Sequence, residues 1–461
     1  MNIIIKNGIL VTGTDTFKAD IAINNGKITT ISDELTEKAD KIIDATGKFV
    51  FPGFIDAHTH LELPVREFFS VDDFYTGTLA AAAGGTTCIV DYIVPFRGQT
   101  LKDAFKLWVN KANNKSVIDY GFHMTISDPE ESIFEEIKDL PDMGVTSIKC
   151  FTAYKGNYML TDDQIYRVFE LSKASDILVS MHCENGYLLD YFVKKFLKEG
   201  KKHPVYHSQT RPPFVESDSI QHAIDIADFA NIPIFIAHLS TAEGLKTIQK
   251  ARFKNKKVFV ETCPQYLLLD DSLYDQDAYE AAKYICSPPL RPAKGLKHLW
   301  NALLNGEIDV FATDHCPFNA GIERKNNLDD FSRIPNGLPG IEDRVNLLFS
   351  EGVKKRKLSL NRFVNLVSST PAKIFGLYPQ KGSLNTGSDA DIVVYDPDCK
   401  WVISANNHHQ NVDYNAYEGI EVTGKPYVVT SRGEIIVENG QITASKGRGK
   451  YIYRQKSTVY N

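Results

Sequence analysis

The sequence predicts an α/β fold in which a (β/α)8 TIM barrel accompanies a small β-sandwich built from both ends of the chain. The middle of the chain alternates short apolar runs with helix-like stretches, which is typical of parallel βα units. Both ends instead alternate apolar and polar positions between turn signals, as half-buried strands do. Of the 461 residues, 43% are hydrophobic and 24% charged, a balance that supports a large core and excludes a disordered chain.

The terminal segments read as short antiparallel strands. In residues 1–51, the N-terminal part of the predicted sandwich, strand-like runs occur at 3–5, 21–23 and 41–44, with a turn signal at Asn25-Gly26. In residues 377–461, the C-terminal part and tail, they return at 391–395, 427–430 and 434–437. Each end alone has few strands to cover a hydrophobic face, so we expect one sandwich from both. Two unrelated caps are the alternative.

The predicted barrel covers residues 52–376. Eight apolar strand-like runs can be counted: 51–60, 85–92, 119–126, 145–152, 177–184, 232–240, 257–266 and 308–315. Eight parallel strands over this length fit a closed barrel better than an open doubly wound sheet. No glycine-rich dinucleotide fingerprint or P-loop follows any run.

Charge and cysteine usage exclude some classes of partner. A formal net charge of −6 leaves no basic surplus for nucleic acid. Lys6 and Asn7 interrupt the first apolar run, which is too short for a signal peptide or a membrane span. Seven cysteines without paired spacing indicate free thiols in a reducing compartment. We therefore expect a cytoplasmic protein without nucleic-acid or membrane partners.

Polar side chains stand near the carboxyl ends of the runs, where barrel enzymes place catalytic groups. The candidates are His58, His60, Lys149, His182, His238 and Asp314. His58 and His60 point to the same side of a strand because side chains alternate faces. Each candidate alone is compatible with an ordinary core or surface role. Together, four imidazoles and a carboxylate favour zinc or a related divalent ion, and the set exceeds the ligands of a mononuclear site.

Lys149 decides how a two-metal site could be built. A cationic amine would repel two divalent ions, so it fits only if it is neutral or converted. Carbon dioxide could carboxylate the amine and make it an anionic bridging ligand.

The motifs resemble those of the dihydropyrimidinase/D-hydantoinase family of cyclic amidohydrolases from end to end. The matching segments are 53–60 (GFIDAHTH), 147–156 (SIKCFTAYKG), 182–185 (HCEN), 238–240 (HLS), 261–266 (ETCPQY), 286–291 (CSPPLR), 313–317 (TDHCP), Pro335-Asn336-Gly337 and Pro339-Gly340. The resemblance implies a metal-dependent enzyme that opens 5,6-dihydropyrimidines or 5-substituted hydantoins to N-carbamoyl amino acids, by means of a hydroxide that bridges two metal ions. It also implies a homotetramer.

The resemblance assigns a role to each candidate. His58, His60 and Asp314 would hold one metal ion, and His182 and His238 the other, with carboxylated Lys149 as the bridge. Asp314 would also act as the general base. Tyr154 would stabilise the oxyanion and contact substrate. The main chains of Ser287 and Asn336 would bind the imide edge of the ring. His315 and Cys316 receive no catalytic role.

Two departures from the family pattern concern specificity. The loop after Pro64 carries Val65-Arg66-Glu67-Phe68-Phe69, which is bulkier and more charged than the usual small residues, and Thr152 replaces a common methionine. Both are expected near the loops for the ring substituent.

Three alternative functions stay open. Allantoinase activity is one, and a dihydroorotase-like activity is another. Dihydroorotases usually have an arginine soon after the His-x-His pair, whereas Leu61-Glu62 follows His60 here, and the carboxylate of Glu62 would repel an anionic substrate. The third is a non-catalytic scaffold, which retention of all six ligands argues against. The tyrosines of the tail (Tyr414, Tyr417, Tyr451 and Tyr453) could pack against a second subunit or within the chain.

Overall fold

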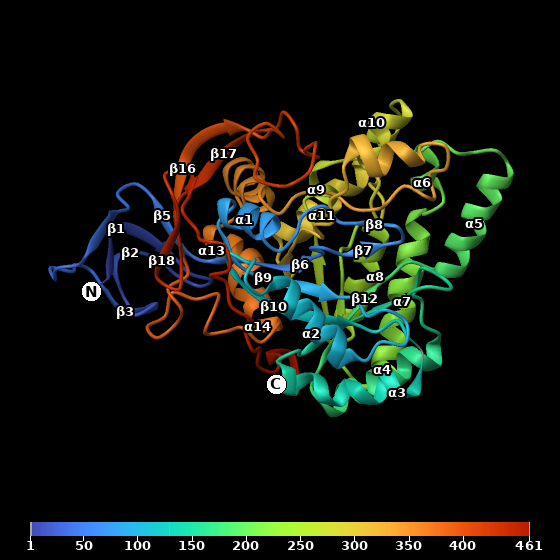
Figure 1. The fold of residues 1–461 in the computed structure, drawn as a ribbon, viewed down its shortest axis with the longest axis horizontal. Helices are drawn as coiled ribbons and strands as arrows, with labels where there is room; N and C mark the ends of the chain where they lie inside the picture. The colour runs from blue at the N-terminus through green and yellow to red at the C-terminus, as the bar shows by residue number, and fades with distance from the viewer. Residues whose placement is uncertain (1, 129, 461) are drawn as a thin grey trace.

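The computed structural model describes residues 2–128 and 130–460 and contains the two predicted parts. Figure 1 shows a barrel of parallel strands ringed by helices, and beside it a second sheet that contains blue N-terminal and red C-terminal strands. The predicted fold class is therefore confirmed: a nearly closed eight-stranded parallel barrel accompanies a β unit built from both ends of the chain.

The barrel strands follow their order in the sequence. They are β6 (Phe54–Thr59), β9 (Thr86–Ile93), β10 (Asp119–Thr125), β11 (Ser147–Phe151), β12 (Leu178–His182), β13 (Ile234–Ile236), β14 (Val258–Thr262) and β15 (Val310–Phe311). Each of the eight predicted runs overlaps one of them. Neighbours pair in parallel from β6 through β15. Such strands are buried on both faces, which explains why they read as nearly continuous apolar runs.

The seam between β6 and β15 is closed by the segments that carry predicted ligands. The backbone N–H of His60 donates to the carbonyl of His315 at 2.9 Å, and that of Asp314 donates to the carbonyl of His58 at 3.0 Å. Thr59 forms an isolated parallel bridge with His315. The first and last strands therefore meet at their carboxyl ends, at the predicted metal centre.

Helices and a short hairpin fill the connections. The longer helices are α1 (Thr76–Ala83), α2 (Leu101–Ala112), α4 (Asp162–Ala174), α5 (Gly186–Lys198), α7 (Pro213–Ala230), α8 (Ala242–Phe253) and α11 (Ala293–Leu304). The shorter ones are α3 (Glu131–Glu135), α6 (Val205–Gln209), α9 (Gln265–Leu268), α10 (Ala278–Ala282), α12 (Arg344–Leu348), α13 (Leu360–Val364) and α14 (Thr370–Ile374). Among the described residues, no helix is both long and apolar enough to span a bilayer.

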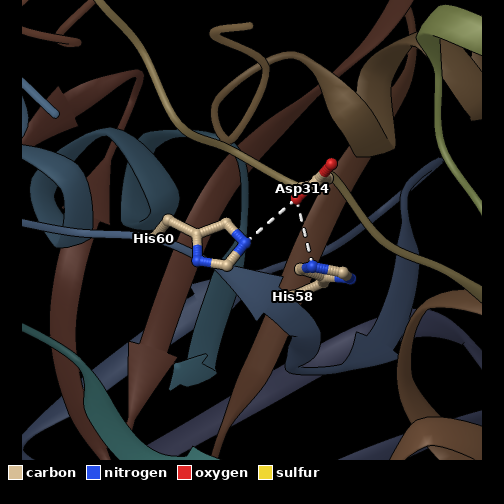
Figure 2. A group of neighbouring side chains, drawn as sticks. All are labelled: His58, His60 and Asp314. Atoms are coloured by element: carbon tan, nitrogen blue, oxygen red, sulfur yellow. Dashed lines mark hydrogen bonds and ion pairs between the residues drawn. The ribbon is translucent and has the colours of Figure 1, made fainter. Parts of the chain in front are cut away.

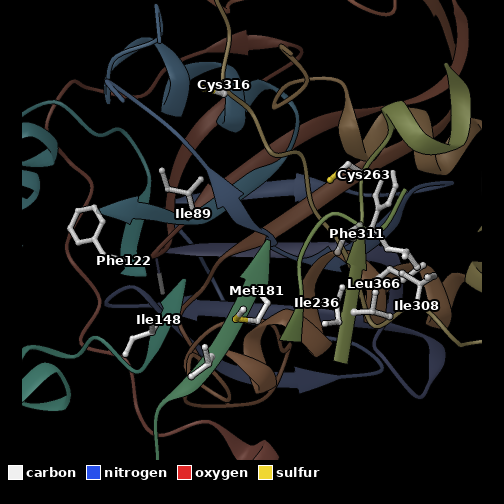
Figure 3. Close-up of a cluster of buried hydrophobic side chains, with 14 of the residues drawn as sticks. Ile89, Phe122, Ile148, Met181, Ile236, Cys263, Ile308, Phe311, Cys316 and Leu366 are labelled. Atoms are coloured by element: carbon white, nitrogen blue, oxygen red, sulfur yellow. The ribbon is translucent and has the colours of Figure 1, made fainter. Parts of the chain in front are cut away.

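Alternation along each strand separates the core from the site. Ile148 and Cys150 of β11 belong to the largest hydrophobic cluster, part of which Figure 3 shows, together with Met181 of β12. Lys149, between them in the sequence, instead lines a cavity inside the barrel mouth. The same two-residue period therefore anchors the strand outward and presents a polar group inward.

The terminal strands form one mixed sheet. They are β1 (Ile3–Val11), β2 (Thr16–Asn24), β3 (Lys27–Ser32), β4 (Lys41–Asp44), β5 (Phe49–Pro52), β16 (Ile392–Val402), β17 (Glu421–Ser431), β18 (Glu434–Glu438) and β19 (Gln441–Ile442). The two ends of the chain join where Phe51 of β5 pairs antiparallel with Val393 of β16. Asn25-Gly26, both at positive φ, makes the tight turn between β2 and β3. A separate cluster of buried aliphatic residues lies within this unit.

A buried lysine connects the terminal sheet to the amino end of the barrel. Lys381 is 1% exposed, and its Nζ lies 2.6 Å from Asp119, 2.8 Å from Asp391 and 3.0 Å from Asp389. Asp119 is the first residue of β10, so this cluster stands at the opposite end of the barrel from the predicted ligands. Burial opposes its charge, but the three carboxylates raise the pKa of Lys381 above its ordinary value.

The tail tyrosines differ in exposure. Tyr414 and Tyr417 are buried within the chain and Tyr451 is half-buried, whereas Tyr453 is 52% exposed. Intrachain packing thus accounts for the first pair. All seven cysteines are free, and all but Cys399 are buried.

Candidate metal centre

The carboxyl ends of the barrel strands surround a cavity of about 190 Å³. The structure brings all six predicted ligands to its wall: His58, His60, Lys149, His182, His238 and Asp314. They come from β6, β11 and β12 and from the residues that follow β6, β13 and β15. Tyr154, Ser287 and Asn336 line the same cavity. Residues spread over more than half of the sequence therefore face one small space.

One group of ligands converges on Asp314. Nε2 of His58 lies 3.0 Å from Oδ1 of Asp314, and Nε2 of His60 lies 3.1 Å from the same oxygen, as Figure 2 shows. One ligand atom from each of the three residues lies within 4.8 Å of the others. Such convergence of imidazole nitrogen and carboxylate oxygen matches the ligands that zinc and related ions take in proteins.

Glu261 of β14 sets the orientation of His58. Its carboxylate hydrogen-bonds to Nδ1 of His58, which leaves Nε2 facing Asp314, and it also accepts the backbone N–H of His238 at 3.1 Å. Burial opposes protonation of His58, but Glu261 and Asp314 raise its pKa to about 9. This position therefore favours positive charge. Carboxylate–histidine pairs of this kind orient metal ligands in proteins.

The pKa values of Asp314 and His60 both lie below their ordinary values, but for different reasons. Burial opposes ionisation of Asp314, but the neighbouring histidines hold its pKa well below the usual range. Burial lowers the pKa of His60 to about 4, although Asp314 partly offsets the effect. At neutral pH the pair therefore combines an ionised carboxylate with a neutral imidazole, the forms that bind metal ions.

A second group is formed by His182 and His238. Nδ1 of His182 lies 3.0 Å from Nε2 of His238. The other ring nitrogen of His182 lies 3.0 Å from Glu184, which also accepts a hydrogen bond from Arg211 at 2.6 Å. Because Glu184 occupies Nε2, Nδ1 of His182 points toward His238. Burial lowers the pKa of both histidines, so both rings are neutral at neutral pH.

Lys149 stands without a polar partner. It is 2% exposed, and no described residue hydrogen-bonds to its Nζ, which lies 5.1 Å from the centre of the Tyr92 ring and 5.6 Å from that of Phe151. Burial lowers its pKa. A buried ammonium without a hydrogen-bonded partner is costly. The residues present therefore fit a pair of divalent ions, with a neutral or modified amine at this position.

Tyr154, Ser287 and Asn336 form a polar wall. Nδ2 of Asn336 donates to the hydroxyl of Ser287 at 2.7 Å. Tyr154 has a left-handed backbone (φ 64°). Burial raises the pKa of Tyr154 to about 12, although Arg211 opposes the effect, so its phenol keeps its proton at neutral pH. The side chains of Asn336 and Ser287 therefore bind one another at the edge of the cavity.

Three residues beside the ligands had not been singled out from the sequence. Glu261 lay inside a matched motif and could have been found as a carboxylate within a buried strand. Tyr92 stacks on His60 with 5.1 Å between ring centres and contacts His58 at 4.6 Å. Asp72 gave no signal in the sequence. It binds Nε2 of the fully buried His315 at 3.0 Å, a contact that supports the segment carrying Asp314.

The predicted specificity positions are only partly at the cavity. Val65, Arg66 and Phe68 line it. Thr152 is not among its lining residues; its hydroxyl donates to the carbonyl of His182 at 2.9 Å. Glu62 is also absent from the cavity wall and binds Lys115 at 2.6 Å. The expected repulsion between Glu62 and an anionic substrate stays a prediction, and Lys115 pairs with this carboxylate.

Comparison with known proteins agrees with this geometry. The model of the amidohydrolase family matches residues 49–436. The chain is 46% identical to D-hydantoinase of Geobacillus stearothermophilus over 457 residues, covering 99% of this chain and 97% of the relative. It is 42% identical to D-hydantoinase of Ralstonia pickettii, with 99% of each chain covered. The crystal structure of dihydropyrimidinase from Brevibacillus agri superposes with a TM-score of 0.98 at 44% identity, over 99% of this chain and 100% of the other.

Proposed function

Because the chain belongs to the dihydropyrimidinase/D-hydantoinase family of amidohydrolases, we propose that it hydrolyses the ring amide of cyclic ureides. The substrates are 5,6-dihydropyrimidines, 5-substituted hydantoins or both, and the products are N-carbamoyl amino acids. The observation that carries this proposal is the convergence of four histidines, Lys149 and Asp314 on one cavity that also presents the phenol of Tyr154.

The donor set suits two divalent ions. His58, His60 and Asp314 would hold one ion, and His182 and His238 the other. Two such ions lower the pKa of water and polarise a carbonyl, which supplies a nucleophile at neutral pH. Four imidazoles favour zinc over magnesium or calcium, which take oxygen ligands.

Lys149 would join the two groups as N6-carboxylysine. Its amine would attack carbon dioxide, so that an N–C bond forms and one proton is released to water, leaving a carbamate anion. The absence of a described hydrogen-bond partner at Nζ supports this proposal, because the carbamate would be stabilised by the two ions.

Asp314 would act as the general base. Oδ1 contacts both histidines, which leaves Oδ2 to accept the proton of the attacking water. The same carboxyl group then returns the proton to the leaving ring nitrogen. The low pKa of Asp314 keeps it ionised before each turnover.

Tyr154 would act at the carbonyl oxygen. Its phenol stays protonated and can donate a hydrogen bond to the oxygen as negative charge develops, which can contribute about 3 kcal/mol to transition-state stabilisation. The backbone groups of Ser287 and Asn336 would hold the imide edge of the ring, and so fix which carbonyl faces the ions.

A substrate panel with metal quantification tests the proposed function. Protein loaded with zinc in the presence of bicarbonate is assayed on dihydrouracil, dihydrothymine, hydantoins, allantoin and dihydroorotate. We expect hydrolysis of dihydrouracil or hydantoins and two metal ions per chain. Failure to open either ring with metal bound would overturn the proposal, and absence of bound metal would favour the scaffold alternative.

Two broader properties follow from the same family membership. We propose a homotetramer, which sedimentation in solution would test. We also propose a cytoplasmic location, and the seven free cysteines support it because a reducing compartment keeps thiols unpaired.

A further inference from the structure

A short hairpin lies at the mouth of the cavity. Strands β7 (Pro64–Val65) and β8 (Phe68–Phe69) pair antiparallel, with Arg66 in the turn at a φ of 55°. The guanidinium of Arg66 donates to the carbonyl of Ser332 at 2.9 Å. Residues 334–337, just beyond, line the cavity together with Arg66. The hairpin is thus held to the segment that carries Asn336.

A groove of about 260 Å³ lies next to the cavity. Arg66, Val94, Asn157 and Tyr158 line both spaces. A substituent on a ring held at Ser287 and Asn336 would reach the groove if it extended past these shared residues. The residues of the groove would then select the chemical group at the far end of that substituent.

The groove carries two guanidinium groups without an acidic partner. Arg66 and Arg97 both line it, and among the described residues neither forms an ion pair with a carboxylate. This local positive charge opposes the overall negative charge of the chain, which is −6. Charge of one sign in a cleft attracts ligands of the other sign and raises their local concentration.

The acidic residues nearby do not neutralise the pair through direct contact. Asp128 also lines the groove, but its two carboxylate oxygens accept the backbone N–H groups of Gly98 at 2.7 Å and Glu130 at 3.3 Å. Glu67 follows Arg66 in the turn, is exposed like the two arginines, and is not among the residues that line the groove. The guanidinium groups are left to a ligand.

The inner part of the path is apolar. Val65, Phe68 and Val94 line the cavity between the polar wall and the groove. Resting on the proposed function, we infer that this chain prefers hydantoins whose 5-substituent has a short apolar stem ending in a carboxylate. Arg66 and Arg97 bind that carboxylate, whereas the apolar residues contact the stem. Arginine is suited to this role because its planar fork matches a carboxylate.

A matched pair of substrates isolates the charge. 5-(2-Carboxyethyl)hydantoin and 5-(2-carbamoylethyl)hydantoin have nearly the same shape, and only the first is anionic. We expect kcat/KM to be about tenfold higher for the carboxylate than for the amide, with the difference mainly in KM. The preference should shrink in 1 M NaCl, where the Debye length is about 3 Å.

Variants assign the preference to the groove. The double variant R66Q/R97Q should reduce the ratio of the two kcat/KM values to about one, and R66K/R97K should restore part of it because the charge returns without the fork. The control K254Q removes one positive charge from an exposed lysine after α8 and should leave the ratio unchanged. Circular dichroism verifies that each variant is folded.

The outcomes separate this inference from the function on which it rests. Equal or better hydrolysis of the amide by the unmodified protein overturns the inference and leaves the hydrolase function standing. A carboxylate preference that survives in folded R66Q/R97Q assigns it elsewhere and also overturns the inference. If neither hydantoin nor dihydrouracil is opened by the metal-loaded protein, the proposed function fails and takes the inference with it.

Discussion

Two buried lysines at opposite ends of the barrel show how one residue type can serve chemistry or stability. Lys149, at the carboxyl end, has no polar partner among the described residues, and burial lowers its pKa. Lys381, at the amino end, lies within 3.0 Å of three carboxylates, which raise its pKa. Burial is nearly equal at 2% and 1%, so the difference lies in the partners.

The comparison teaches that an unsatisfied buried charge and a satisfied one have different consequences. Three carboxylates compensate the desolvation of Lys381 and join the terminal sheet to the barrel. At Lys149 the nearby carboxylates of Glu261 and Asp314 offset the desolvation only in part, and no described residue hydrogen-bonds to its Nζ. This division agrees with barrels in general, where the carboxyl face carries function and the amino face carries stability.

The largest expected effect comes from removing the unpartnered lysine. K149M should abolish binding of both metal ions and reduce kcat/KM by at least about 10³-fold, because the proposed bridging ligand is lost. The free energy of unfolding of the metal-free protein should stay the same or rise, since a buried amine is replaced by an apolar side chain. Metal analysis, kinetics and urea unfolding measure these effects. Retention of both ions would contradict the bridging role.

A variant of Tyr154 tests whether the carboxyl end of the barrel also stabilises the transition state. Y154F should lower kcat by about 10²- to 10³-fold with a smaller change in KM, because the lost hydrogen bond strengthens only as charge develops on the oxygen. Y166F, in a tyrosine of α4 outside the cavity, is the control and should behave as the unmodified protein. A loss confined to KM would assign Tyr154 to substrate binding alone.

At the opposite end the expected change is in stability. K381M should lower the free energy of unfolding by about 3–5 kcal/mol, because it leaves buried carboxylates without their partner. Metal content should be retained in the folded fraction. Urea unfolding of K381M beside K149M makes the comparison direct, and a greater destabilisation by K149M would reverse the assignment of the two ends.

The smallest expected effect is a change in how the free energy of unfolding depends on pH in acid. Burial opposes ionisation of Asp389, but Lys381 holds the pKa of this carboxyl below its ordinary value of 3.8. A lowered pKa contributes stability that is present above the ordinary value and is lost as the pH falls through the folded-state pKa. D389N should cost about 1.5 kcal/mol at pH 7 and flatten this acid dependence. Unfolding curves between pH 7 and 3 test it; parallel curves would contradict the contribution.

Much of the molecule could be predicted because periodicity records which face of a strand is buried. The eight strands, the joining of the two ends and the meeting of the six ligand residues at one cavity all follow from alternation and from the geometry of parallel strands. Lys149 illustrates this, since its apolar neighbours Ile148 and Cys150 determine that it faces inward.

Contacts across the barrel could not be predicted in the same way. The hydrogen bond from His58 to Glu261 joins residues 203 positions apart, and it depends on how two strands face each other across the barrel interior. The pairing of Glu62 could not be predicted for a similar reason, because its partner Lys115 lies beyond α2, and nothing near Glu62 in the sequence indicates that pairing. Single-strand patterns carry no information on such pairings.

The closure of the barrel through His58, His60 and the Asp314–His315 segment determines when the set of ligands becomes complete during synthesis. His60 and Asp314 are 254 residues apart, and they meet only when the last strand reaches the first. A nascent chain still emerging from the ribosome therefore holds an incomplete set of ligands, and so does any fragment that ends before residue 314. The hydrolytic centre becomes complete only once the whole barrel has been made, which keeps half-finished chains from acting on substrate.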